Sequence, residues 1–175
     1  MAKIIYLHGF ASSANSTKAL QLKKYILENY SKTEIIIPDI ENNIVDAVQQ
    51  IDKLIEEFSP SALIGSSLGG FYATYFSEQY NLKCVGINPA VIPPAEMSEY
   101  LGENKNYSTG EKFLINQEQL DLLDRMGREL KVIKCPRNFM ILLQSHDEKL
   151  DYRVATNFYK GAVPVSYTHL RAHET

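Results

Sequence analysis

Short apolar runs alternate with longer amphipathic stretches along most of the chain. Five runs have the length and composition of buried strands, at 3–7, 34–37, 61–65, 84–87 and 138–144. Five stretches carry apolar residues at helical spacing, at 16–30, 44–58, 68–80, 117–130 and 151–160. Strands that alternate with helices of this length predict βαβ units, and therefore one α/β domain on a mainly parallel sheet.

The alternation fades between residues 92 and 116. Proline, glycine and asparagine interrupt this segment, and Tyr100, Tyr107 and Phe113 lie between them. An insertion of this length in an α/β domain is often an active-site lid, which is the expectation here. A plain surface excursion is the alternative. No internal repeat or second domain is evident, so the predicted domain covers residues 1–164.

Composition and charge narrow the classes of function. The net charge of −3 argues against a surface that neutralises nucleic-acid phosphates. No apolar run approaches the length that spans a bilayer, and the start of the chain lacks the layout of a cleavable signal. We therefore expect a cytoplasmic protein in which Cys84 and Cys135 are free buried thiols rather than a disulfide.

A serine motif lies between a predicted strand and a predicted helix. The stretch Gly65-Ser66-Ser67-Leu68-Gly69 fits Gly-x-Ser-x-Gly, the elbow that presents a nucleophilic serine in α/β-hydrolases. Its place between an apolar strand and an apolar helix predicts that Ser67 occupies the turn. The alternative is a serine that only caps the helix at a glycine-rich turn.

A second motif, His8-Gly9-Phe10, follows the first predicted strand. Ester hydrolysis passes through an oxyanion that backbone N–H groups stabilise. One such donor follows the nucleophile, here Leu68, and the other comes from a loop after a neighbouring strand, here Phe10. His8 precedes the serine, whereas the base of this fold follows both serine and acid, so we expect His8 to brace the loop.

Acidic residues follow the last long strand. Asp147 occupies the place of the acid that orients the catalytic histidine, and Asp151 is the second candidate. The alternative for Asp147 is a cap on the helix that follows. His146 is adjacent to Asp147, and consecutive residues rarely face each other, so it is a poor candidate for the base.

Together these motifs make the chain similar to a known family, the YqiA-like esterases, which are small bacterial α/β-hydrolases. The similarity covers roughly residues 4–160, and the matching stretches in chain order are Tyr6-Leu7-His8-Gly9-Phe10 with Ser12-Ser13, 65–74, Asn88-Pro89-Ala90, 100–104, Thr109-Gly110, Asp147-Glu148 and 150–153. The resemblance implies an α/β-hydrolase fold with Ser67 as nucleophile and Asp147 as acid. His146 departs from the small residue expected at its position.

The end of the chain departs from the family. The resemblance implies a further strand, a Gly-Gly-x-His segment with the base and a last helix, whereas residues 165–175 resemble the translation of a sequencing adapter. We therefore expect a truncated domain, with its final strand and helix missing and a non-native tail. His169 and His173 lie 22 and 26 residues after Asp147, close to the expected base, but in this interpretation neither is the base.

The resulting hypothesis is a serine hydrolase of carboxylic esters, with thioesters within reach, that works through an acyl-serine without metal or cofactor. A small-molecule acyl ester is the expected substrate. Because the base is missing in this interpretation, the chain itself is expected to be inactive. A serine peptidase or acyltransferase on the same scaffold, and a non-catalytic binding protein, are the alternatives.

Overall fold

A computed structural model describes residues 1–91, 93–144 and 151–167. Its main sheet has six strands in the spatial order β2-β1-β3-β4-β7-β8. All neighbouring strands are parallel. The strands are β1 (Ala2–Leu7), β2 (Thr33–Ile36), β3 (Ala62–Ser66), β4 (Lys83–Ile87), β7 (Phe139–Gln144) and β8 (Val163–Tyr167).

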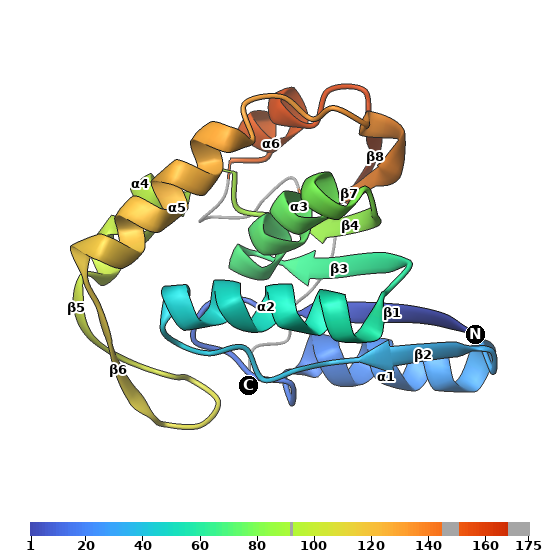
Figure 1. The fold of residues 1–175 in the computed structure, drawn as a ribbon, viewed down its shortest axis with the longest axis horizontal. Helices are drawn as coiled ribbons and strands as arrows, with labels where there is room; N and C mark the ends of the chain where they lie inside the picture. Colours follow the sequence, from blue (N-terminus) through green and yellow to red (C-terminus); the bar gives the residue numbers. More distant parts are fainter. Residues whose placement is uncertain (92, 145–150, 168–175) are drawn as a thin grey trace.

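Helices connect these strands and cover the sheet. They are α1 (Thr17–Asn29), α2 (Ile44–Phe58), α3 (Leu68–Tyr80), α5 (Gln117–Glu129) and α6 (Tyr152–Phe158). Polar side chains define where several of them begin: Ser16, Asn43 and Asn116 accept hydrogen bonds from backbone N–H groups of the first turn. In Figure 1, α2 and α3 lie in front of the sheet and α1 lies behind it.

The segment after β4 folds over the edge of the sheet at which the parallel strands end. It contains α4 (Pro93–Met97), the 3-10 turn η1 (Ser98–Tyr100) and an antiparallel hairpin of β5 (Gly102–Lys105) and β6 (Lys112–Ile115). The hairpin runs past the amino-terminal end of α2 (Figure 1). The predicted lid region is therefore a folded unit at the carboxyl edge, where open α/β sheets bind ligands.

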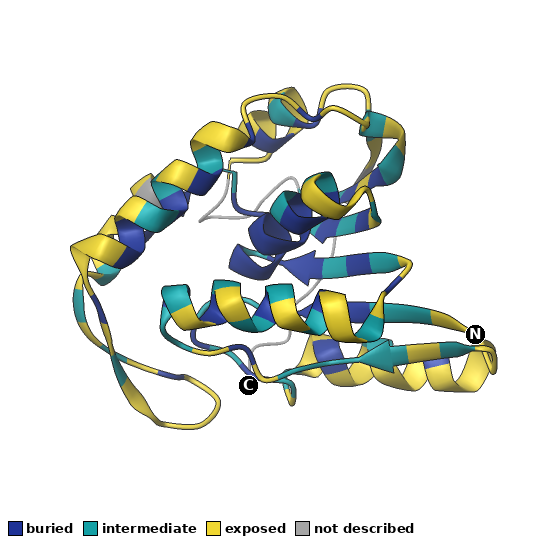
Figure 2. Ribbon diagram, viewed as in Figure 1, coloured by how far each residue is buried: buried dark blue, intermediate teal, exposed yellow. Residues whose placement is uncertain are grey.

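The core lies between the sheet and its helices, and α3 is its centre. Nine of the thirteen residues of α3 are buried, which appears as an almost wholly dark helix in Figure 2. By contrast, α1 buries only Ala19 and Ile26. Leu20, Tyr25 and Leu27 of α1 are 49%, 54% and 62% exposed. The apolar stripe predicted for this helix is thus only partly covered by the described residues.

Two sequence predictions about the fold need correction. The main sheet has six strands rather than five, because Val163–Tyr167 pairs with β7 in the place where a final strand was expected to be missing. β-branched and aromatic residues favour a strand there, and Pro164 is tolerated because β8 is at the edge of the sheet. The thiols of Cys84 and Cys135 are free as predicted, but Cys135 is exposed.

Candidate active site

Ser67 occupies a sharp turn between β3 and α3. Its φ and ψ are 53° and −122°, a region that non-glycine residues rarely adopt. Hydrogen bonds hold the turn through both the N–H and the carbonyl of Ser67. The Ser67 N–H donates to the Ile87 carbonyl at 3.1 Å, and the Ser67 carbonyl accepts from the N–H groups of Gly70 at 2.9 Å and Ala90 at 3.0 Å. These bonds stabilise the strained conformation that the elbow requires.

The glycines around Ser67 are required for steric reasons. A side chain on Gly65 would collide with the carbonyl of Gly69, and one on Gly69 would collide with the carbonyls of β1 and the loop after it. A Cβ on Gly70 would lie 2.7 Å from the Cβ of Pro89. The small residues of the motif therefore let the elbow pack between the ends of β1 and β4.

The Ser67 side chain does not cap α3. Ser67 precedes the first helical residue, but its hydroxyl makes no capping hydrogen bond, and its backbone is not in the extended conformation of an ordinary N-cap. The structure thus argues against the capping alternative. A Cβ built on Gly9 would lie 3.4 Å from the Ser67 Cβ and 4.0 Å from its Oγ, so the serine side chain lies beside the loop that follows β1.

His8 braces that loop through both ring nitrogens. The Ile40 N–H donates to Nε2 at 2.9 Å, so Nε2 is an acceptor and the neutral ring carries its proton on Nδ1. Nδ1 donates to the Gly9 carbonyl at 2.9 Å. Burial lowers the pKa of His8 below its usual value, which favours this neutral form. Because Nε2 is occupied, His8 is not placed to act as a base for Ser67.

The bond from His8 also orients the next N–H group. The peptide bond between Gly9 and Phe10 is trans and planar, so its carbonyl and its N–H point in opposite directions. With the Gly9 oxygen directed to the imidazole, the Phe10 N–H is directed away from it. One small cavity of about 20 Å³ is lined by Gly9, Phe10, Leu68 and neighbouring residues. This volume is enough for one water-sized group.

Leu68 is the first residue of α3, so its N–H has no acceptor within the helix. The structure therefore brings the two residues predicted for the oxyanion hole to the same cavity, beside the serine.

The hairpin β5–β6 also holds the loop that follows β1, which carries Phe10. The Tyr107 N–H donates to the carbonyl of Ala11 at 2.8 Å, and Ala11 has a strained φ of 53°. The side-chain amide of Asn106 donates to the carbonyl of Ser12 at 3.0 Å and to the Asn42 Oδ1 at 2.9 Å. Asn106 is only 3% exposed. The hairpin is thus tied to the loop that carries Phe10.

Aromatic rings reinforce this connection. The ring centroid of Phe10 lies 4.8 Å from that of Tyr100 and 5.5 Å from that of Phe113. Such tilted and edge-on contacts stabilise a pair by about 0.5–1.5 kcal/mol beyond the burial of area. The Phe10 side chain therefore anchors the loop to the segment after β4.

Asp147 lies outside the described residues, as do His146, His169 and His173. The residue just before this gap is placed: the Gln144 N–H donates to the Asn88 Oδ1 at 2.7 Å. Asn88 follows β4, whose last residue, Ile87, accepts from the Ser67 N–H. β7, the last described strand before Asp147, therefore ends at the same edge of the sheet as the elbow.

Asp151, the second candidate for the acid, has a structural role. Its carboxylate accepts from the Arg153 N–H at 2.9 Å and caps α6, and its side chain is exposed. This position gives no support to Asp151 as the partner of a catalytic histidine.

Sequence reasoning missed Asn88 and Asn106 as parts of the site. An asparagine directly after a strand is a signal for Asn88, because asparagine tolerates the positive φ of 42° found there. Asn106 gave no such signal, since its partners Ser12 and Asn42 are far away in the sequence.

Comparison with known proteins places the chain in a family. Residues 3–168 match the family described as "Uncharacterised protein family (UPF0227)". The chain belongs to the UPF0227 family. This confirms the resemblance to YqiA-like proteins. A UPF0227 protein of Pectobacterium carotovorum subsp. carotovorum (strain PC1) is 25% identical over 183 aligned residues, 98% of this chain and 89% of the relative. One of Pectobacterium atrosepticum is 28% identical over 160 residues, 85% and 77% of the two chains.

Solved structures share the fold of this UPF0227 chain. Est1E of Butyrivibrio proteoclasticus, solved with ferulic acid, has a TM-score of 0.71 at 13% identity, over 95% of this chain and 79% of its own. Mouse alpha/beta hydrolase domain-containing protein 10 has a TM-score of 0.71 at 14% identity, over 94% and 78%. These neighbours and the parallel sheet with flanking helices confirm the predicted α/β-hydrolase fold.

Among the described residues of this UPF0227 protein, no helix is long and apolar enough to cross a membrane.

Proposed function

We propose that this protein is a serine hydrolase of carboxylic esters, with thioesters as chemically accessible substrates. The observation that carries the proposal is the strained turn at Ser67, whose hydroxyl makes no capping hydrogen bond. The residue that follows it, Leu68, lines a small cavity together with Phe10. A protein that used Ser67 only as a helix cap would not need this backbone strain.

Each residue has a role in the proposed reaction. The Ser67 Oγ attacks the acyl carbonyl carbon, and the carbonyl oxygen becomes an oxyanion that accepts hydrogen bonds from the Phe10 and Leu68 N–H groups. The alcohol leaves with a proton, and water then releases the acid from the acyl-serine. Asp147 is the proposed acid that orients the base and stabilises it when it is charged.

Asp147 lies outside the described residues, and the described residues supply no base for the triad. His8 is the one histidine among them, and its Nε2 already accepts from Ile40. In the proposal, as in the sequence interpretation, His169 and His173 do not serve as the base. The chain is therefore expected to hydrolyse esters slowly, with the oxyanion hole supplying residual catalysis.

Names of the structural neighbours support an ester substrate. Est1E is solved with ferulic acid, and other neighbours are an esterase domain of Rhodothermus marinus and a monoacylglycerol lipase of Paleococcus ferrophilus. A peptidase or acyltransferase on this scaffold is the second candidate of the same chemistry, and a binding protein without catalysis is the alternative from another class.

The test is hydrolysis of p-nitrophenyl acetate together with labelling by a fluorophosphonate, which reacts with activated serines. Because no base activates Ser67 in this chain, we expect slow turnover and only slow covalent labelling during prolonged incubation, and Ser67→Ala should abolish the labelling and reduce turnover to the level of buffer. Ser61→Ala is the matched control, because Ser61 is an exposed serine just before the opposite end of β3. Labelling that persists in Ser67→Ala contradicts the proposal, and an unlabelled protein that still binds esters favours the non-catalytic alternative.

A further inference from the structure

A groove between α5 and α6 has no role in the proposed chemistry. It has a volume of about 670 Å³, within the range of small-molecule sites. Its described walls come from three parts of the chain: the start of the segment after β4, the carboxyl-terminal half of α5 with the residues that follow it, and α6.

Most of the wall is apolar. The apolar lining residues are Val91, Pro93, Val132, Ile133, Val154 and Phe158. Two of them remain open to water, since Val132 is 73% exposed and Val154 is 40% exposed. Covering such side chains is favourable by about 25 cal/mol for each Å² of apolar surface removed from water. An aliphatic group is the chemistry that this wall fits.

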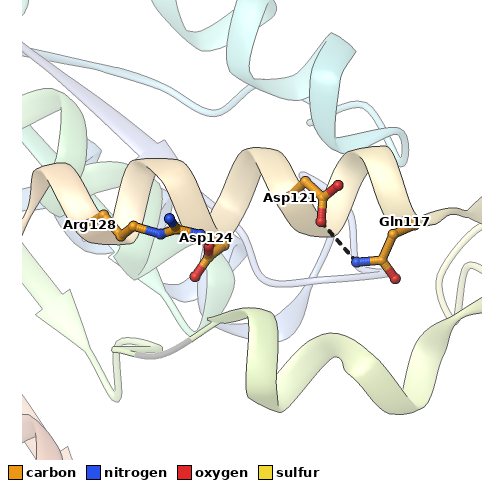
Figure 3. A network of polar contacts seen from close by, with 4 residues as sticks. All are labelled: Gln117, Asp121, Asp124 and Arg128. Atoms are coloured by element: carbon orange, nitrogen blue, oxygen red, sulfur yellow. Dashed lines mark hydrogen bonds and ion pairs between the residues drawn. The ribbon is translucent and has the colours of Figure 1, made fainter.

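Positive charge gathers at the rim. Arg128, Lys131 and Lys160 line the groove together with one acid, Asp124. Arg128 and Asp124 form an ion pair along α5, and Figure 3 shows the two side chains next to each other. Lys131 and Lys160 have no ion-pair partner among the described residues. The groove therefore has an excess of positive charge, although the whole chain has a net charge of −3.

Gly127 gives an independent indication that the groove is kept open. It lies within α5 and lines the groove, where a glycine is less favourable than alanine by about 1 kcal/mol. No described neighbour requires a glycine at this position, because a Cβ built there meets no described atom within 4 Å apart from the backbone of its own helix. Its missing side chain leaves space in the groove instead.

We propose that this groove binds an aliphatic carboxylate, with the chain against the apolar wall and the head group at Lys131 and Lys160. The choice of a carboxylate over other anions rests on the proposed function, because ester hydrolysis releases one. Val91, in the groove wall, follows Ala90, whose N–H donates to the Ser67 carbonyl. The groove thus begins one residue from the contact that holds the elbow.

The test is calorimetric titration of the full chain with sodium decanoate below its micellar concentration. The protein carries Ser67→Ala, so that binding is measured independently of the proposed function. We expect saturable binding of one decanoate per chain, and binding of decyltrimethylammonium, which has the opposite charge, should be at least 10-fold weaker. Equal binding of the two amphiphiles, or no decanoate binding, overturns the proposal.

Two matched pairs of variants locate the site. Gly127→Phe should fill the groove and weaken decanoate binding at least 10-fold, whereas Gly127→Ala should retain binding. Lys131→Glu should weaken binding, and Lys23→Glu on α1, an equally exposed lysine away from the groove, should not. Urea unfolding checks that each variant is folded. Undiminished binding in both folded Gly127→Phe and folded Lys131→Glu overturns the assignment to this groove, even if Ser67 proves to be catalytic.

Discussion

Two non-glycine residues beside the proposed oxyanion hole, Ser67 and Ala11, have the same positive φ of 53°. Each such conformation costs on the order of 1–3 kcal/mol and persists only where its surroundings enforce it. Ser67 is held by Ile87 and Ala90, and Ala11 by Tyr107. The site is therefore preorganised by backbone bonds from two separate segments of the chain, the end of β4 with the residues after it and the hairpin.

Sequence reasoning could place Ser67 at the turn, because the spacing of the glycines reflects the steric requirement of that turn. It also predicted that His8 braces the loop, from chain order alone. It could not predict how, because the partner of the His8 Nε2 is a backbone N–H at Ile40, 32 residues away. Every residue except proline carries such an N–H group, so side-chain identity does not show which one is the donor.

The buried neutral His8 makes stability depend on pH. Its folded pKa is lowered by burial, so on acidification below about pH 6.5 the unfolded chain takes up a proton that the folded chain refuses. We expect the free energy of unfolding to fall as the pH drops through this range, by up to about 1.4 kcal/mol per pH unit from this group. The measurement is urea unfolding between pH 8 and pH 5.

His8→Gln is the comparison for that titration. Glutamine does not titrate, so the variant should be less stable at pH 8 but should lose less stability on acidification. Parallel curves for the two proteins would mean that the pH dependence comes from other groups.

The hairpin β5–β6 is an element of secondary structure that the sequence pattern did not predict. Helices 44–58 and 68–80 were predicted with their observed ends from apolar residues at helical spacing. The hairpin strand Gly102–Lys105 has no apolar alternation. Its position depends on Asn106 and Tyr107 bonding to the loop after β1, which a local pattern does not record.

We therefore expect Asn106 to position the loop after β1 that carries Phe10. Asn106→Ala removes its buried bonds to Ser12 and Asn42, and we expect a loss of about 2–3 kcal/mol of stability. A displaced Phe10 N–H should also lower the kcat for ester hydrolysis about 10-fold with little change in KM, since removing one oxyanion donor costs about 10²–10³-fold.

Asn104→Ala is the matched control for Asn106→Ala. The Asn104 amide donates only to carbonyls near its own turn, those of Tyr100 and Gly102. The control should lose stability without the loss in kcat. An equal loss of kcat in both variants would mean that Asn106 has only a structural role.

At the scale of the whole molecule, parallel topology gathers the ends of all six strands of the main sheet at one edge. Ser66, Ile87 and Leu142 lie in successive register across β3, β4 and β7, and Gln144 pairs with Tyr167 across β7 and β8. β7 and β8 therefore both end at the edge of the sheet that carries Ser67. The alternation of strands and helices predicted this arrangement for every strand except β8. The pairing of β8 depends on the free edge of β7 more than on the sequence of β8 itself.

This topology makes the source of the base a direct experimental question, because His169 comes two residues after β8. We predict that His169→Ala, His173→Ala and the double variant hydrolyse p-nitrophenyl acetate within about twofold of the unchanged chain. Replacing residues 165–175 with the carboxyl-terminal segment of the Pectobacterium carotovorum relative should raise kcat by about 10³-fold or more, since a missing triad member costs several orders of magnitude. Ser67→Ala in that chimera should abolish the gain. If His169→Ala alone removes the turnover of the unchanged chain while its unfolding curve stays the same, the residues after β8 supply the base and the interpretation of the tail as non-native is wrong.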